Sequence, residues 1–449
     1  MRQALARRIC LMAVIVDYIG VGMMRTCLPF YALQMGGTAT TVGALEACYG
    51  VGQVVGATVM GRVSDKYGRK IVLLLSFLGS AIGYGMVGVA TTTTGLLMSR
   101  VPVGLAKQTV AVARAVVADC VPRADLSAAM ARLTGLMASG YVVGPLLGGY
   151  LSEANCVKLA VALFVCLVPI TMLFLPETNP ALIAGAAEAR NLGTSGAGAG
   201  KEVVGVGGAG GAGGGQGKKA VRVSPSFGNA DYDGIGGQGG AGTELDLEAE
   251  RWKISRLVAM LMLPEFAVVA YSGAGIGALV RSLGKDRSFL GQVNSATAFI
   301  AALSSSCLLP WMCRNFRFRD VTLLTAGILM FATASATLAS YPTETGVLVT
   351  VPLFAVALSF LRSCPAAFLS KAAPMSMQGE AMGALDSASS VCRVFAPLVA
   401  GVLADKLGSS APFGMCSFAC LGGLVALRMN VGGVMASHVA SSKSKAKEE

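Results

Sequence analysis

Hydrophobic stretches of about 20 residues follow one another along most of the chain, and short polar segments separate them. At a rise of 1.5 Å per residue, a helix of about 20 residues crosses roughly 30 Å of hydrocarbon. The pattern therefore predicts an all-α membrane protein with twelve transmembrane helices. The predicted spans are 9–34, 42–60, 71–90, 95–119, 129–152, 157–176, 264–282, 288–309, 321–340, 346–369, 380–403 and 409–428.

A glycine-dominated segment, residues 185–245, divides the predicted helices into two groups of six. Such a composition cannot bury enough apolar surface to fold. The sequence therefore predicts two six-helix halves joined by a flexible connection. The predicted parts are an N-terminal half, 1–180, a largely disordered linker, 181–255, a C-terminal half, 256–430, and a polar tail, 431–449.

The composition supports a membrane protein and excludes a nucleic-acid partner. Hydrophobic residues make up 54% of the chain and charged residues 13%, whereas soluble domains have about 25% charged residues. The net charge of +12 resides in segments that flank apolar stretches, and aromatic residues, at 6%, are too sparse for a base-stacking groove. Basic residues concentrate in alternate loops, which predicts that both termini and the linker are cytosolic. The host membrane, plasma or organellar, stays open.

The sequence predicts no metal site, no cofactor and no enzymatic activity. The twelve cysteines occur singly, without a CxxC pair, and His438 is the only histidine. The glycine-rich segment contains no phosphate-binding motif.

Charged residues inside the predicted spans are the candidate functional residues. Each costs roughly 2.5–3.5 kcal/mol at a helix centre, so each needs a partner, water or a function. Residues seven apart lie about 20° from eclipsed on a helix, so we expect Arg100, Lys107 and Arg114 to form one stripe on the fourth span. Polar residues seven apart share a face on the second and eleventh spans in the same way, and Asp17 and Arg25, eight apart on the first, lie within about 80° of each other. The stripes predict a common wet cavity for protons and substrate, with ion pairs that lock the bundle as the alternative. The candidates are Asp17, Arg25, Glu46, Gln53, Arg100, Lys107, Arg114, Asp386 and Arg393.

Residues 61–70, GRVSDKYGRK, form a predicted charged turn between the second and third spans. Their pattern resembles the loop between helices 2 and 3 of the major facilitator superfamily. The resemblance implies a cytosolic gate between the halves, formed by Gly61, Asp65, Gly68 and Arg69. Asp119, at the end of the fourth span, is the expected carboxylate partner of Arg69.

The fifth span contains the pattern GxxxGPxxGG. Small residues four apart allow helices to approach closely in lipid, and the proline favours a kink. The pattern resembles a motif of proton-coupled exporters in the same superfamily. The residues expected to pack and kink this helix are Gly140, Gly144, Pro145, Gly148 and Gly149.

Two further patterns extend the resemblance to the tetracycline/drug:proton antiporter group and the vertebrate organic-cation-transporter-like carrier. They are DxxGxG from Asp17 with Pro29, and RxxxG from Arg100. The resemblance implies a monomeric secondary transporter in the lipid bilayer that exports a small organic solute by alternating access, coupled to protons. The candidate residues include five basic and only three acidic ones, which suits an anionic substrate. An organic-anion uniporter or exchanger is therefore the alternative function. A membrane sensor or scaffold that transports nothing is the alternative of another class.

Overall fold

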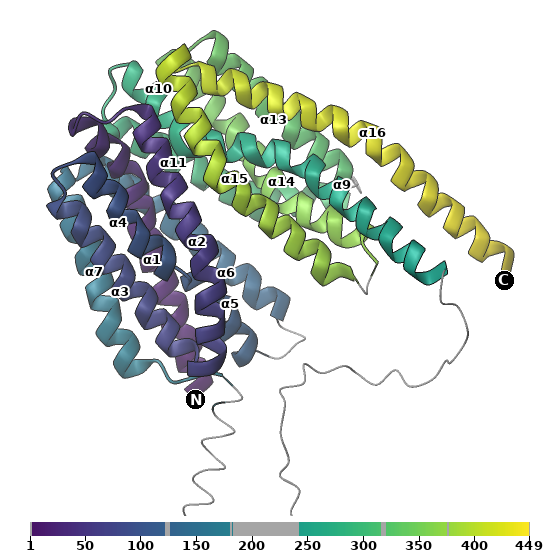
Figure 1. The fold of residues 1–449 in the computed structure, drawn as a ribbon, viewed down its shortest axis with the longest axis horizontal. Coiled ribbons are helices and arrows are strands. Elements are labelled where there is room, and N and C mark those ends of the chain that lie inside the picture. The colour runs from purple at the N-terminus through teal and green to yellow at the C-terminus, as the bar shows by residue number, and fades with distance from the viewer. Residues whose placement is uncertain are drawn as a thin grey trace, which may run out of the picture. The chain divides into compact units, whose positions relative to one another are not determined.

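The computed structural model describes residues 2–121, 126–179, 182, 242–315, 320–374 and 377–448. Within these ranges the chain is helical, without strands, and short turns connect the helices (Figure 1). The all-α prediction is confirmed. The elements are α1 (Arg2–Gln34), α2 (Ala39–Tyr67), α3 (Arg69–Val89), α4 (Thr93–Ala106), α5 (Thr109–Cys120), α6 (Leu126–Tyr150), α7 (Glu153–Phe174), α9 (Gly242–Ala270), η2 (Tyr271–Gly275), α10 (Ile276–Ser282), α11 (Arg287–Leu303), η3 (Ser304–Leu308), α12 (Leu309–Asn315), α13 (Asp320–Ser340), α14 (Glu344–Ala372), α15 (Gln378–Leu407) and α16 (Ala411–Glu448).

Eleven helical stretches in the described part of the chain are long and apolar enough to cross a membrane. They correspond to all predicted spans except 129–152, which forms α6. This helix is rich in glycine, and it packs against α1 on one side and α11 on another. Because neighbouring helices cover it, α6 needs less apolar surface of its own than a helix that faces lipid.

The fourth span is not one straight helix. It breaks at Lys107 and Gln108, between α4 and α5. The backbone N–H of Gln108 donates to the Ser76 hydroxyl on α3 at 3.1 Å, and that hydroxyl lies 2.9 Å from the Thr109 hydroxyl. The Ser76 side chain of α3 thus satisfies a backbone N–H that the break releases inside the bundle, and Thr109 of α5 holds this side chain in place. The predicted single stripe of Arg100, Lys107 and Arg114 is therefore wrong, because it assumed an unbroken helix.

Two predicted boundaries also differ from the structure. The chain is already helical at Gly242, because α9 begins inside the predicted linker, 181–255. At the other end, the backbone of α16 stays helical to Glu448, through the predicted polar tail. The linker between 183 and 241 lies outside the described residues. Its disorder stays a prediction. The helices α1 to α7 before it and α9 to α16 after it are called the N-terminal and C-terminal halves below.

Contacts between the halves concentrate on two helix pairs. Within the compact unit that holds both halves, α2 packs along α15, and α6 packs along α11 (Figure 1). The C-terminal half has an aromatic core in which Tyr271 stacks on Phe354 at 4.2 Å between ring centroids, with Phe331 and Phe413 edge-on around them. In the N-terminal half, Phe164 on α7 packs against residues of α3.

Candidate functional site

The most deeply buried charges of the candidate site form one ion pair. Asp17 on α1 is 1% exposed, and its Oδ1 accepts a hydrogen bond from Lys107 Nζ at 2.5 Å. Lys107 itself stands at the break between α4 and α5, and its ammonium lies 4.7 Å from the centroid of the Phe164 ring. Asp17 Oδ2 is buried and has no hydrogen-bond partner among the described residues. One carboxylate oxygen is therefore committed to the lysine, and the other can take a proton or a hydrogen-bond donor.

Arg25, two turns along α1, connects the halves. Its guanidinium donates to the Tyr141 hydroxyl on α6 at 2.9 Å, and to the backbone oxygen and hydroxyl of Ser272 at 2.9 and 3.1 Å. Ser272 lies in η2, a π-helical turn, and such turns release backbone carbonyls from the regular α-helical ladder. Arg25 therefore satisfies a carbonyl of the seventh predicted span. This structural role could not be predicted from the sequence around Arg25, because Ser272 is 247 residues away.

A second group of candidates lies around Tyr49 on α2. The Tyr49 hydroxyl accepts a hydrogen bond from Gln53 at 2.8 Å, and its ring lies within electrostatic range of Asp17, Glu46 and Arg100. Arg100 is 6% exposed, and its Nε has no hydrogen-bond partner among the described residues. Residues from the first, second and fourth spans therefore lie near one another, and the common cavity stays a prediction.

The remaining candidates are more exposed. Arg114, Asp386 and Arg393 have exposed side chains, and Arg393 donates to Ser390 Oγ on its own helix at 2.9 Å. Two charged residues were not among the predicted candidates, Glu265 on α9 and Arg362 on α14. Glu265 interacts electrostatically with Arg362 and with Arg393. Both are charged residues inside predicted spans, so the criterion that defined the candidate residues applies to them as well.

The predicted gate at 61–70 differs from the expected turn. The helix α2 continues to Tyr67, and Gly68 alone, at φ 102°, reverses the chain before α3. Nothing lies within 4 Å of a Cβ built on Gly61, so no close contact requires glycine at this position. The structure contains the expected pair of Arg69 with Asp119, at 3.5 Å between Nε and Oδ2. The side chain of Asp65 lies outside the described residues, and a gating role for these residues stays a prediction.

Glu177, in the segment after α7, is a further residue of this cluster. Its carboxylate accepts the backbone N–H groups of Arg69 and Lys70, at 2.9 and 3.2 Å, and thereby caps the N-terminus of α3. A Cβ on Gly68 would overlap this carboxylate, so glycine is required there by space as well as by φ. Glu177 is 108 residues from Arg69 in the sequence, so no local pattern reveals this cap.

Replacing Glu177 by Gln is expected to destabilise the protein by about 1–2 kcal/mol, because it removes a negative charge at a helix N-terminus and leaves an amide facing a backbone donor. The measurement is the apparent melting temperature in detergent, against Glu250→Gln as control. Glu250 pairs with Lys253 on an exposed helix surface, where a loss of well under 1 kcal/mol is expected. Equal stability of the two variants would refute the capping role.

Polar contacts between the halves cluster at the end of the bundle opposite Arg69; we call it the closed end, formed by 34–42, 145–155, 281–295 and 397–410. Asp405 on α15 accepts the backbone N–H groups of Ala39 and Thr40 at 2.9 and 2.7 Å, so it caps α2 from the other half. Arg287 pairs with Glu153 at 2.5 Å. In the part of the chain that the structure describes, these polar contacts tie the N-terminal to the C-terminal helices at this end of the bundle.

The glycines of the fifth span permit the expected close packing. A Cβ on Gly140 or Gly144 would lie 2.7 or 2.5 Å from a backbone oxygen of α1, and one on Gly148 would also overlap α1. Gly149 instead faces α11, where a Cβ would lie 3.0 Å from the Arg287 oxygen. Pro145 lies within an uninterrupted α6, so the kink stays a prediction.

The described residues contain no candidate metal site and no disulfide. No group of three or more His, Cys, Asp or Glu side chains there is arranged to hold a metal ion, and the cysteines of this part are free thiols.

Comparison with known proteins identifies the family. The profile of the Major Facilitator Superfamily matches residues 10–247, more than half of the chain. The chain belongs to the major facilitator superfamily. It is an integral, multi-pass membrane protein, and its family and relatives are transport proteins and not enzymes, as predicted. Its orientation and oligomeric state stay predictions.

Curated relatives match a limited part of the chain. The class H tetracycline resistance protein of Pasteurella multocida is 35% identical over 150 residues, which are 33% of this chain and 38% of the relative. Multidrug resistance protein 1 of Bacillus subtilis is 25% identical over 171 residues, 37% of this chain and 44% of the relative. The chain thus spans less than half the length of these relatives.

Solved structures match nearly the whole chain. The human organic anion transporter MFSD10 (TETRAN) has a TM-score of 0.61 at 18% identity and covers 95% of this chain and 100% of its own. The nucleoside transporter NupG has a TM-score of 0.67 at 13% identity, with coverages of 95% and 98%. At these identities the likeness shows the fold alone.

Proposed function

We propose that the protein is a secondary transporter that exports a small organic solute by alternating access and couples this movement to protons. Membership of the superfamily supports transport, and the tetracycline and multidrug resistance proteins that match about a third of the chain support export of a drug-like solute. The observation that carries the coupling is the buried pair of Asp17 and Lys107.

The pair links protonation to structure. A proton on Asp17 removes the charge that balances Lys107, and a buried ammonium without a counter-ion is strongly unfavourable. Lys107 lies where α4 ends and α5 begins, a break held by side-chain hydrogen bonds and not by a continuous helical ladder. Loss of the pair is therefore expected to move α4 and α5 relative to α1. Protonation and rearrangement become one event.

The same pair suggests how a substrate competes with the proton. Asp17 Oδ2 is the available acceptor, and Tyr49 and Gln53 lie on the neighbouring helix. A cationic or hydrogen-bond-donating solute would bind the carboxylate that a proton otherwise neutralises. With both termini in the cytosol, as the loop charges predict, the closed end faces away from the cytosol, and we assign the structure to the inward-facing state of the proposed cycle.

One observation favours the second candidate, an organic-anion uniporter or exchanger. Arg100 is buried and its Nε lacks a partner among the described residues. A buried unsatisfied donor costs about 1–3 kcal/mol, and more on a charged group, so an anionic substrate would be stabilised there.

Flux in proteoliposomes tests the proposal. A panel of cationic, neutral and anionic solutes is measured with and without an imposed pH gradient. One proton moving down about 100 mV and one pH unit supplies about 3.7 kcal/mol, enough for accumulation of several hundredfold. We expect accumulation only with the gradient. Gradient-independent exchange of anions would favour the second candidate, and absence of flux for the whole panel would favour a sensor or scaffold.

A further inference from the structure

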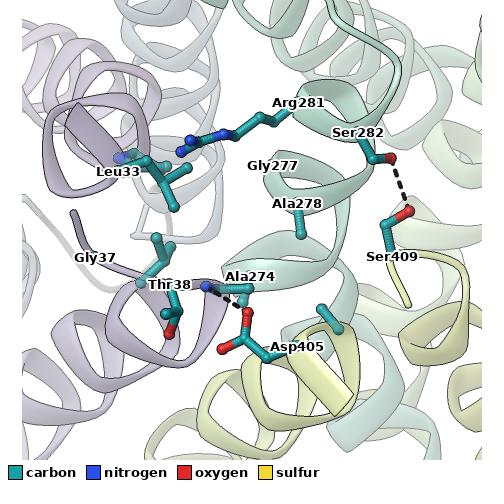
Figure 2. A pocket seen from close by; sticks show the side chains of 14 residues that line it. Leu33, Gly37, Thr38, Ala274, Gly277, Ala278, Arg281, Ser282, Asp405 and Ser409 are labelled. Atoms are coloured by element: carbon teal, nitrogen blue, oxygen red, sulfur yellow. Dashed lines mark hydrogen bonds between the residues drawn. The ribbon is translucent and has the colours of Figure 1, made fainter. Parts of the chain in front are cut away.

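A cavity of about 440 Å³ opens at the closed end, between the two halves of the bundle (Figure 2). Its volume is in the range of sites that hold small organic ligands. Apolar and small side chains form most of its wall, and both halves contribute to it. The residues that matter below are Leu33 and Thr38 from the N-terminal half, and Ala274, Ala278, Arg281 and Asp405 from the C-terminal half.

The cavity contains one positive charge that the protein leaves uncompensated. Arg281, at the end of α10, extends its guanidinium across the cavity toward Leu33 on α1 (Figure 2). The Arg281 side chain is exposed to solvent, and no hydrogen bond or ion pair joins its guanidinium to another of the described residues. The next basic residue along the chain, Lys285, pairs with Glu344 at 2.5 Å and does not line the cavity.

The one carboxylate of the wall does not cancel this charge. Both oxygens of Asp405 accept backbone N–H groups at the start of α2, where the helix dipole also balances its negative charge. Asp405 lies across the cavity from Arg281 in Figure 2. On a third side, the hydroxyls of Ser282 and Ser409 are hydrogen-bonded to each other at 2.7 Å, and their free capacity adds a polar contact.

We propose that this cavity is a binding site for a small organic anion, distinct from the buried site around Asp17. Its carboxylate or sulfonate group pairs with Arg281, and its apolar body lies against Leu33, Ala274 and Ala278. A metal cation is disfavoured, because the wall offers a single carboxylate that is already committed. The positive group of a zwitterion would likewise find no available carboxylate, so a zwitterion is not expected to bind more tightly than a simple anion.

Occupancy of this site stabilises one conformation. The wall is complete only while α1 and α2 meet α10 and α15 at the closed end, so a ligand that contacts both sides binds that state preferentially. The anion therefore slows opening of this end. This effect on flux depends on the proposed transport cycle, whereas binding itself does not.

The probe for binding is benzenesulfonate, with uncharged methyl phenyl sulfone as its match in shape. Both are titrated by calorimetry into the purified full-length protein in detergent. We expect benzenesulfonate to bind and the sulfone to bind about tenfold more weakly or not at all, because a charge-assisted hydrogen bond is lost. Arg281→Gln should weaken benzenesulfonate to the level of the sulfone. Lys285→Gln, a charge change of the same size beside the cavity, should leave it unchanged.

Two further variants make the result decisive. Ala278→Phe fills the cavity without removing a charge and should abolish binding of both compounds. Arg100→Ala alters the buried site and should leave binding at the closed end intact. The proposal is overturned if Arg281→Gln and Ala278→Phe bind benzenesulfonate like the parent chain. It is equally overturned if Arg100→Ala alone abolishes binding, since the anion then occupies only the buried site. Both results are independent of whether the protein transports anything.

Discussion

Replacement of Asp17 by Asn is expected to reduce accumulation driven by a pH gradient by a factor of about 100 or more. It should also reduce the amount of folded protein. The single change leaves the Lys107 ammonium buried without its counter-ion, and breaking a buried pair in this way costs about 3–5 kcal/mol. The nearby Phe164 ring compensates only part of that cost.

The double variant Asp17→Asn/Lys107→Gln separates coupling from folding. It removes both charges, so we expect stability to return close to that of the parent chain while pH-driven accumulation stays lost. Downhill flux of the same solute should persist but with a higher KM, because the amide oxygen can still accept a hydrogen bond from the solute but no longer offers it a negative charge. The matched control is Glu250→Gln/Lys253→Gln, an exposed pair whose loss should alter neither stability nor coupling measurably. Parental accumulation in the double variant would show that this pair does not carry the proton.

The same measurements compare the two candidate functions. If the protein exchanges organic anions, Arg100→Ala should abolish substrate binding, because the buried guanidinium is then the main contact of the anion. Arg393→Ala would weaken binding less, since that side chain is exposed and bonds Ser390 on its own helix. Under proton-coupled export the Asp17 variants have the larger effect. Binding and flux at two pH values therefore distinguish the functions.

The sequence predicted most of the fold because membrane helices show themselves in hydropathy alone. Each apolar stretch of about 20 residues must be helical to satisfy its backbone in lipid. The sequence pattern did not predict the break in the fourth span or the start of α9. The break at Lys107 depends on the Ser76 hydroxyl of another helix, which no local pattern reveals. The start of α9 at Gly242 lies in a segment whose glycine content argues against a helix.

For the candidate site, the sequence indicated which charges lie inside the bundle but not which of them pair. Asp17 and Lys107 are 90 residues apart, and neither has its partner on the same helix. The contact of Arg25 with η2 likewise depends on a π-helical turn in the other half. By contrast, Arg69 and Asp119 both stand at the ends of spans on one side, so their pairing followed from topology alone. Pairing across the bundle needs the packing, which single-helix periodicity does not contain.

The packing of α6 against α1 leads to the second large effect. Gly144 faces Gly22, and a Cβ added to Gly144 would lie 2.5 Å from the Ile19 oxygen and 3.0 Å from the Gly22 Cα. These are backbone atoms, which cannot move without displacing a whole helix. In lipid such backbone contact is a main source of helix association, so even one methyl group is costly.

Gly144→Ala is therefore expected to destabilise the protein by about 2–3 kcal/mol or to prevent its folding, because overpacking costs this much even where flexible side chains can adjust. The control is Gly135→Ala on the same helix, where a Cβ would have no neighbour within 4 Å. That change should be neutral or stabilising by up to about 1 kcal/mol, since alanine favours a helix over glycine. Melting temperatures and yields of monodisperse protein in detergent compare the two variants. If Gly144→Ala is as stable as Gly135→Ala, close approach of α1 and α6 is not what requires glycine at this position.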